Sequence, residues 1–357
     1  MNRSLTIEQL NSEEVGRLMP LLVFLGMVVS TGIPGKITVC VVYWAKSKES
    51  VSRFFIWWLA VIDTISCFVI FLEIVSVVKQ YTYTNTWLCK FTAFLAVWSV
   101  ITSAFALCLI SFDRFQRICT PHHIQVCQQK AKFMCLSTVA IALVISLPSL
   151  ILYGAYTEEI SHHNLTSSAC TIQNKYQGTN FALFYHIFLW ILFLFVLIFL
   201  SVCYTMIGRK IYKQMGLRPS MASNNDVCMN TSFTVLKTYQ NVCKENCTVS
   251  RNTCMSTLSN RSTVQGQAKA RQSALLMFLI SLVFVVSFLP ILISRMIGAF
   301  DLTFEKSMSD TGRACYKFFK RTYFLNCAIN PFIYCACAAT FRQEGRAHFR
   351  RLISRFR

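Results

Sequence analysis

Seven long runs of apolar residues alternate with polar stretches along this chain. The apolar runs lie at about 19–45, 54–78, 90–118, 133–155, 181–208, 272–298 and 314–338. A helix of about 20 apolar residues is long enough to cross the hydrocarbon core of a bilayer. The pattern therefore predicts an all-α membrane protein, a bundle of seven transmembrane helices that occupies residues 19–338.

Three polar stretches stand out. Residues 1–18 contain three glutamates and nothing that resembles a cleavable signal peptide, so we expect the first apolar run to act as the insertion signal. Residues 212–268 are rich in Ser, Thr and Asn, which predicts a disordered third cytoplasmic loop. Residues 339–357 are rich in arginine, which predicts a short amphipathic eighth helix on the inner leaflet and a cytoplasmic tail.

The composition agrees with a membrane protein. The chain is 54% hydrophobic and 14% charged, with a mean hydropathy of +0.48, whereas a soluble domain exposes more charge. A net charge of +20 would suit a nucleic-acid partner, but most basic residues follow the first, third and fifth apolar runs or lie in the tail. This distribution predicts an extracellular N-terminus and a cytoplasmic C-terminus, and no nucleic-acid partner.

Cysteines on the predicted extracellular side suggest a disulfide. Cys89 begins the third apolar run, and Cys170 lies between the fourth and fifth runs. A disulfide persists on an oxidising side and would hold this long loop over the mouth of the bundle. Asn2 and Asn164 begin N-x-Ser/Thr patterns on the same side, so we expect both to be glycosylated.

Four cysteines in the predicted third cytoplasmic loop have no histidine nearby, and we therefore expect no metal site: Cys228, Cys243, Cys247 and Cys254.

A proline interrupts the seventh apolar run. At membrane depth, some other group must satisfy the carbonyl that Pro331 leaves without a donor. Asn330 directly precedes it, and we expect the Asn330 amide to serve that carbonyl. Tyr334 follows one turn later, at the predicted cytoplasmic end.

The motifs, in this order, resemble those of the rhodopsin-like (class A) G-protein-coupled receptors over nearly the whole chain. Cys89 lies 25 residues before Arg114, as the disulfide cysteine of that family does. The other motifs that carry the resemblance are Leu59-Ala60-Val61-Ile62-Asp63, Asp113-Arg114-Phe115, Tyr204, Phe284, Phe288-Leu289-Pro290, Asn326, Asn330-Pro331-Phe332-Ile333-Tyr334 and Phe341-Arg342.

The resemblance implies a plasma-membrane receptor that binds an extracellular ligand and activates a heterotrimeric G protein. Receptor kinases and arrestin are further implied partners, and neither a cofactor nor enzymatic activity is expected. In the implied switch, Asp113 pairs with Arg114 at rest, and the released Arg114 reaches toward Tyr204 and Tyr334. The alternative is an interfacial arginine whose guanidinium extends to lipid headgroups.

The polar core departs from the family at one position. Asp63, Ser103, Asn326 and Asn330 match the cluster that binds sodium in family members, but Lys36 stands where the family has an asparagine. Opposite charges favour ionisation of both groups, so we expect the Lys36 ammonium to replace the cation and pair with Asp63. The alternative is that Lys36 turns outward to the membrane surface.

The predicted outer half indicates the ligand class. Ala96 stands where amine receptors carry an aspartate, which argues against a monoamine ligand. The expected binding residues lie near the outer mouth, together with the residue in the toggle-tryptophan position: Glu73, Arg295, Lys320, Arg321 and Phe288. Arginine favours planar carboxylate partners. With the aromatic residues nearby, this set suits a neuropeptide ligand.

Other interpretations remain open. The ligand is alternatively a small acidic molecule or odorant, and Glu73 and Lys320 alternatively neutralise one another. A transporter or channel is disfavoured because no internal repeat is visible in the sequence. An intramembrane enzyme is disfavoured because His186 is the only histidine in an apolar run and no metal motif accompanies it.

Overall fold

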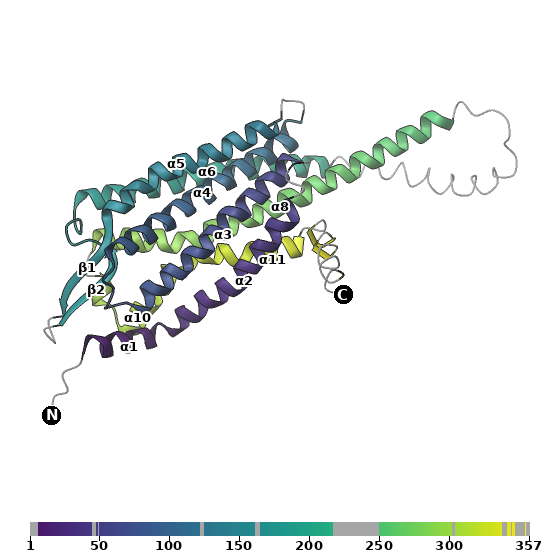
Figure 1. Ribbon diagram of the computed structural model, residues 1–357. Helices are drawn as coiled ribbons and strands as arrows, with labels where there is room; N and C mark the ends of the chain where they lie inside the picture. Colours follow the sequence, from purple (N-terminus) through teal and green to yellow (C-terminus); the bar gives the residue numbers. More distant parts are fainter. Residues whose placement is uncertain are drawn as a thin grey trace.

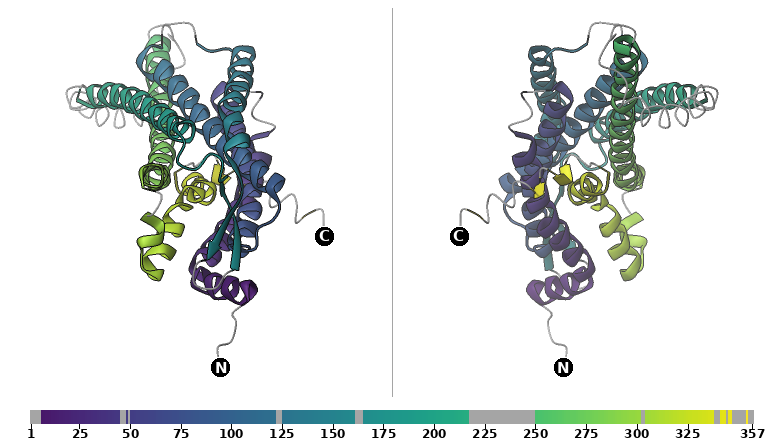
Figure 2. Two further views of the ribbon diagram at one scale, coloured as in Figure 1. Left: turned by 90° about the vertical axis from the view of Figure 1, so that its left-hand side faces the viewer. Right: turned by 90° about the vertical axis from the view of Figure 1, so that its right-hand side faces the viewer.

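The computed structural model describes residues 6–44, 48, 50–121, 125–160, 165–216, 250–301, 304–337, 341–343, 345–346 and 354. Its long helices run side by side in one bundle (Figure 1). Two shorter elements, helix α1 and the β1–β2 hairpin, lie together at one end, which Figure 2 (left) turns toward the viewer. We call this the hairpin end, and the other the opposite end.

Six helices are long and apolar enough to cross a membrane, among the described residues. The helices that contain them are α2 (Met19–Trp44), α3 (Val51–Val78), α4 (Thr86–Cys119), α5 (Gln128–Leu152), α6 (Asn180–Gly216) and α8 (Ser250–Phe300). The seventh passage consists of α10 (Asp310–Phe319), the 3-10 helix η2 (Thr322–Phe324) and α11 (Leu325–Cys337). The predicted seven-helix fold is confirmed.

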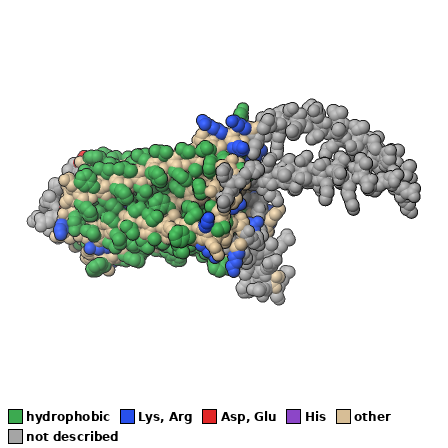
Figure 3. All heavy atoms as spheres, turned by 90° about the horizontal axis from the view of Figure 1, so that it is seen from above, with side chains coloured by type: hydrophobic (Ala, Val, Ile, Leu, Met, Phe, Trp, Pro, Cys, Tyr) green, Lys and Arg blue, Asp and Glu red, His purple; other side chains and the backbone are tan. Residues whose placement is uncertain are grey.

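Apolar side chains cover the outside of the bundle. Figure 3 shows them along its length, with Lys and Arg side chains toward the two ends. Exposed large residues such as Phe195, Val144 and Val286 have exposed fractions above 60%. An apolar side chain can face lipid without a hydrophobic penalty. These residues therefore suit helices that pack against the bundle on one side and face lipid on the other.

Several boundaries differ from the predicted ones. The fourth helix ends at Leu152 rather than near residue 155, because Tyr153 begins strand β1 (Tyr153–Ile160). Helix α6 continues to Gly216 and α8 begins at Ser250, so 212–216 and 250–268 are helical rather than disordered. Neither segment contains a proline, and each continues a stable transmembrane helix. Residues 217–249 of the predicted loop lie outside the described residues.

The chain before the first membrane helix is also helical. Helix α1 (Ile7–Arg17) starts at a capping box, in which Thr6 and Gln9 satisfy one another's backbone N–H groups. After the seventh passage, residues 341–343 and 345–346 of the predicted eighth helix are helical. Arg342 donates to the carbonyls of Cys335 and Ala336 and so caps the end of α11.

The hairpin is tied to the bundle by a disulfide. Strand β2 (Leu165–Ile172) pairs antiparallel with β1, and Ala155 faces Cys170. Cys170 is bonded to Cys89 of α4 with a Cα–Cα distance of 5.5 Å, so the predicted disulfide is confirmed. Ser168 exchanges backbone hydrogen bonds with Tyr81 and Tyr83, both 2.8 Å long. The hairpin is therefore joined to the loop after α3 as well as to α4.

We predict that Cys89→Ser and Cys170→Ser each sharply lower delivery of the protein to the cell surface, because either change frees the hairpin from α4. The measurement is surface immunolabelling against total protein. Cys315→Ser, which changes an exposed free cysteine of α10, is the matched control and should leave delivery unchanged. Normal delivery of both disulfide variants would contradict the prediction.

Candidate functional site

Asp63 of α3 is the centre of the polar core. It is 1% exposed, and donors from three other helices reach its carboxylate. The Lys36 ammonium of α2 and the Asn330 amide of α11 both donate to Oδ2, the amide at 2.9 Å. Ser103 of α4 donates to Oδ1 at 3.1 Å. Because Lys36 is also only 1% exposed, the alternative that it turns outward is wrong.

Close packing of α2 against α11 brings these groups together. A Cβ added to Gly35 would lie 2.7 Å from the Cβ of Pro331, so any larger residue would push the helices apart. The predicted role of Asn330 toward the carbonyl freed by Pro331 is wrong. Its amide is given to Asp63, since a buried carboxylate needs donors more strongly than a carbonyl does.

A column of aromatic rings lies next to the polar core. Phe284 and Phe288 have ring centroids 4.5 Å apart, Phe288 and Tyr323 5.5 Å, and Tyr323 and Phe324 4.1 Å. A small cavity of about 20 Å³ separates the column from Ser103 and is lined by polar side chains that include Asn326. Among the described residues, no donor reaches Asn326 Oδ1. The column and the polar core therefore border the same small cavity.

A larger cavity, of about 100 Å³, lies on the other side of the column. Its walls are apolar and come from three helices, α4, α6 and α8, together with Tyr323 of η2. Representative wall residues are Ala96, Val100, Phe193, Val196, Phe288 and Leu292. Arg295 is the charged residue in this lining. The cavity thus combines an apolar wall with one cation.

The Arg295 guanidinium lies over the Tyr153 ring, 5.4 Å from its centroid. Tyr153 is the first residue of β1, so the disulfide-tethered hairpin supplies this contact. No described carboxylate forms an ion pair with Arg295. An aromatic face leaves the in-plane N–H groups of a guanidinium unused, and those groups bind carboxylates in pairs.

Each of the other predicted ligand-binding charges has a partner of opposite charge. Arg321 lies 3.2 Å from Glu73, and Lys320 lies 3.0 Å from Glu305 in helix α9 (Phe304–Ser307). The alternative in which Glu73 neutralises Lys320 is therefore wrong. Burial raises the pKa of the Glu305 carboxyl, but Lys320, with help from Lys317, outweighs burial and lowers this pKa overall.

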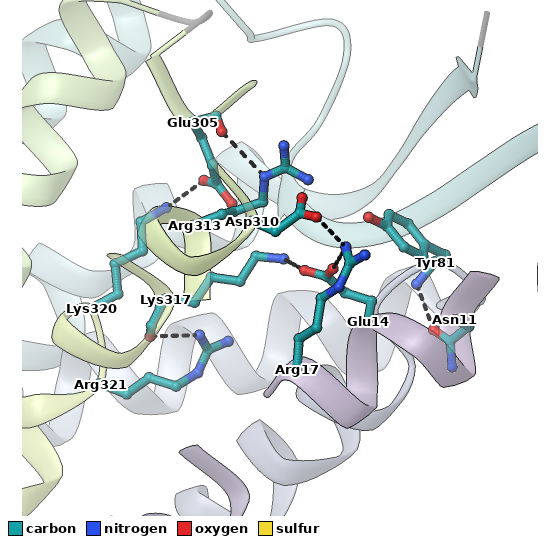
Figure 4. A network of polar contacts seen from close by, with 10 residues as sticks. All are labelled: Asn11, Glu14, Arg17, Tyr81, Glu305, Asp310, Arg313, Lys317, Lys320 and Arg321. Carbon is teal, nitrogen blue, oxygen red and sulfur yellow. Dashed lines mark hydrogen bonds and ion pairs between the residues drawn. The ribbon is translucent and has the colours of Figure 1, made fainter. Parts of the chain in front are cut away.

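Sequence reasoning missed the pair between Lys317 of α10 and Glu14 of α1. The two charged atoms lie 2.8 Å apart, and both side chains are buried. Figure 4 shows this pair within a network that also includes Arg17, Arg313 and Lys320. The available signal was the spacing of Arg313, Lys317 and Arg321, which puts three cations on one side of a helix.

The predicted ion pair between Asp113 and Arg114 is wrong. Asp113 accepts instead from Arg117 Nε, at 3.0 and 3.1 Å, and from the Ser52 hydroxyl of α3 at 2.6 Å. Residues four apart on a helix share a side, whereas neighbours project about 100° apart. Arg114 is buried, and no described group accepts a hydrogen bond from its Nε.

The two switch tyrosines lie on different helices and have different partners. The Tyr204 hydroxyl of α6 is 3.0 Å from Ser281 of α8. Tyr334 of α11 is buried and packs against the rings of Tyr43 and Phe341, and its hydroxyl has no partner among the described residues. Arg114 and Tyr334 thus each have a buried polar atom without a hydrogen-bond partner among the described residues.

Some predicted sites cannot be placed. Asn2, Asn164, Cys228, Cys243 and Cys247 lie outside the described residues, and so does the Cys254 side chain. Within the described part of the chain, no group of three His, Cys, Asp or Glu side chains is arranged to hold a metal ion.

Known proteins resemble parts of this chain. C3a anaphylatoxin chemotactic receptors from Oncorhynchus mykiss and Danio rerio are each 30% identical to it, over 50% of this chain and 50% and 49% of theirs. Bombesin receptor subtype-3 from Ovis aries is 28% identical over 57% of this chain and 52% of its own. The matched region therefore spans about half the length of these relatives.

A family model covers more of the chain. The model for the 7 transmembrane receptor (rhodopsin family) matches residues 36–334, from Lys36 of the polar core to Tyr334 at the end of the seventh passage. This range includes the disulfide, the polar core, the cavity and Arg114. The chain belongs to the rhodopsin family of seven-transmembrane receptors.

Proposed function

We propose that this receptor binds an extracellular peptide with an acidic group and activates a heterotrimeric G protein. The observation that carries the proposal is Arg295, which lines an apolar cavity beneath the tethered hairpin and has no described carboxylate partner. An acidic group of the ligand would bind the guanidinium, and an apolar or aromatic group would fill the cavity.

The hairpin end is taken as extracellular and the opposite end as cytoplasmic, in the plasma membrane. A disulfide persists in an oxidising compartment, which supports the first assignment. Helices α2, α4 and α6 end at the opposite end, and the basic loops follow them in the sequence, which supports the second. Receptor kinases and arrestin would then meet the same end as the G protein.

The peptide class rests on the charges around the mouth and on the relatives. Their names refer to C3a anaphylatoxin and bombesin, and both words denote polypeptides. A small acidic molecule is the second candidate, because a cavity of about 100 Å³ is smaller than a typical drug-sized site. A peptide would place one side chain or terminus in the cavity and the rest outside it.

The signal would pass from the cavity to the opposite end through contacts already described. Phe288 lines the cavity and packs on Tyr323, which borders the polar core. Asn330 links that core to α11, whose last turns carry Tyr334. A ligand that moves Phe288 would therefore shift α11 relative to Asp63, and release Arg114 and Tyr334 to find new partners.

Ligand-stimulated nucleotide exchange tests the proposal. Membranes with the receptor and a G protein would be screened with a neuropeptide library and with small carboxylic acids, while ion flux is recorded in the same membranes. Exchange stimulated by an acidic peptide supports the proposal, and exchange stimulated only by small acids favours the second candidate. Ion flux without exchange would overturn both.

We predict that Arg295→Ala weakens an acidic peptide agonist by roughly 10- to 150-fold, the effect of losing a charge-assisted hydrogen bond. Lys320→Ala is the matched control and should cost less, because Glu305 already neutralises Lys320. Potency in nucleotide exchange is measured at equal surface levels. A peptide amidated at its acidic group should act alike on the wild type and Arg295→Ala. Equal potency of the native agonist on both would remove Arg295 from the site.

A second prediction concerns the opposite end. Arg114→Ala should abolish nucleotide exchange but keep agonist affinity, since Arg114 lies far from the cavity along α4. Arg117→Ala removes the same charge three residues later and should retain exchange, because Arg117 serves Asp113. Asp113→Asn should leave basal exchange near the wild-type level. A large basal increase in Asp113→Asn would show that Asp113 restrains Arg114 after all.

A third prediction concerns Lys36. If its ammonium replaces the sodium of family members, sodium should not stabilise the wild type more than potassium does at equal ionic strength. Lys36→Met leaves Asp63 buried without its ion pair and should cost about 3–5 kcal/mol. Lys36→Asn should regain stability selectively in sodium. The measurement is the thermal unfolding midpoint of the purified receptor in sodium and in potassium. A sodium-selective shift of this midpoint in the wild type would contradict the prediction.

A further inference from the structure

The outer end of the seventh passage carries a row of cations. Arg313 and Lys317 lie on α10, and Lys320 and Arg321 follow directly after it, at spacings that place them on one side. Three of the four have a carboxylate partner, and each partner comes from a different element. Glu14 of α1 meets Lys317, Glu305 of α9 meets Lys320 and Glu73 of α3 meets Arg321.

The Glu14–Lys317 pair differs from the other two in its burial. The exposed fractions of the side chains are 5% for Glu14 and 7% for Lys317, whereas Lys320 and Glu305 are about one third exposed. Arg17 lies 3.6 Å from Glu14 and 3.1 Å from Asp310 of α10, and closes the network on its solvent side (Figure 4). Lys317 is thus covered by α1.

A buried ion pair is a poor stabiliser compared with apolar side chains of similar volume, because both charges lose their hydration. Its best-attested use is to fix one arrangement or to switch between two. A carboxylate from another molecule offers Lys317 the same interaction as Glu14 does. The pair therefore suits exchange more than it suits permanent attachment.

Helix α1 has a second attachment that does not involve charge. The Asn11 amide donates to the carbonyl of Val78, and its oxygen accepts from the N–H of Tyr81, both at 2.9 Å. These bonds hold α1 against the end of α3. The Glu14 side chain can therefore leave Lys317 while α1 stays docked.

We propose that Lys317 accepts a carboxylate of the ligand, and that Glu14 occupies this subsite as a built-in competitor when the ligand is absent. The inference rests on the proposed function in taking the ligand to be an acidic peptide. Arg295 in the cavity and Lys317 below α1 would then bind two separate acidic groups. A ligand with one acidic group would bind either Arg295 or Lys317. A ligand with two acidic groups would bind both and displace Glu14.

The test uses the purified full-length receptor and two probe peptides, tetraglutamate and its uncharged control tetraglutamine, at equal ionic strength. The readout is the shift of the thermal unfolding midpoint relative to the same variant without peptide. Glu14→Gln keeps the side-chain shape and frees Lys317, so we expect it to bind tetraglutamate at least about tenfold more tightly than the wild type. Glu14→Gln combined with Lys317→Met should lose this gain.

Further variants separate this subsite from its neighbours. Glu305→Gln frees Lys320 instead, and should give a smaller gain because that pair is already exposed to solvent. Arg295→Ala combined with Glu14→Gln should keep the gain, so a failure of the proposed cavity site would not affect the result. If Glu14→Gln does not fold, Glu14→Asp keeps the charge, loosens the pair and should give an intermediate gain.

The outcomes are decisive for the exchange subsite. Equal shifts for wild type and Glu14→Gln, including no shift in either, would overturn it. A gain that survives Lys317→Met would also overturn it, because the peptide would then bind other cations. Nucleotide exchange plays no part in this readout, so the G-protein proposal stands or falls separately.

Discussion

A carboxylate buried at membrane depth must find its donors inside the protein, and Asp63 finds them on three other helices. Lys36, Ser103 and Asn330 come from α2, α4 and α11, and each contact fixes the height of its helix relative to α3. Apolar side chains that face lipid do not fix the position of a helix along the bundle axis, because one apolar contact with lipid resembles another. The positions of the cavity and of Tyr334 therefore depend on this cluster.

The aromatic column and the floor of the cavity also depend on the Asp63 cluster. Tyr323 and Asn326 belong to the same passage as Asn330, so anchoring Asn330 also sets the aromatic column and the floor of the cavity. The passage is broken at Arg321, between α10 and η2, and donors from this passage serve carbonyls of α8. Tyr316 donates to Ser294 and Thr322 to Ser287, at 2.8 and 3.1 Å. These hydrogen bonds hold both sides of the break against α8.

The sequence predicted features that depend on one helix or on a forced partner. Apolar length predicted the membrane helices, and the cost of a buried cation predicted that Lys36 meets Asp63. Prediction from the sequence failed where a side chain had several possible partners. Asp113 had two arginines within reach, and only helix geometry chooses Arg117 over Arg114. The Glu14–Lys317 pair joins residues 303 positions apart, so the spacing of the cations could mark Lys317 but could not identify Glu14 as its partner.

Ion pairs are arranged differently at the two ends of the bundle. At the hairpin end they join separate elements: α10 is joined to α1, and the two residues after α10 are joined to α9 and α3. They therefore resist separation of those elements. At the opposite end the Asp113–Arg117 pair lies within α4, and Asp113 is joined to α3 by a hydrogen bond from Ser52 rather than by an ion pair. The contact between Tyr204 and Ser281 joins α6 to α8 by a hydrogen bond between two neutral hydroxyls, whose net contribution is smaller than the cost of breaking a buried ion pair. Ion pairs therefore join α10 and the residues after it to other elements at the hairpin end, whereas at the opposite end neutral or charge-assisted hydrogen bonds join α3 to α4 and α6 to α8.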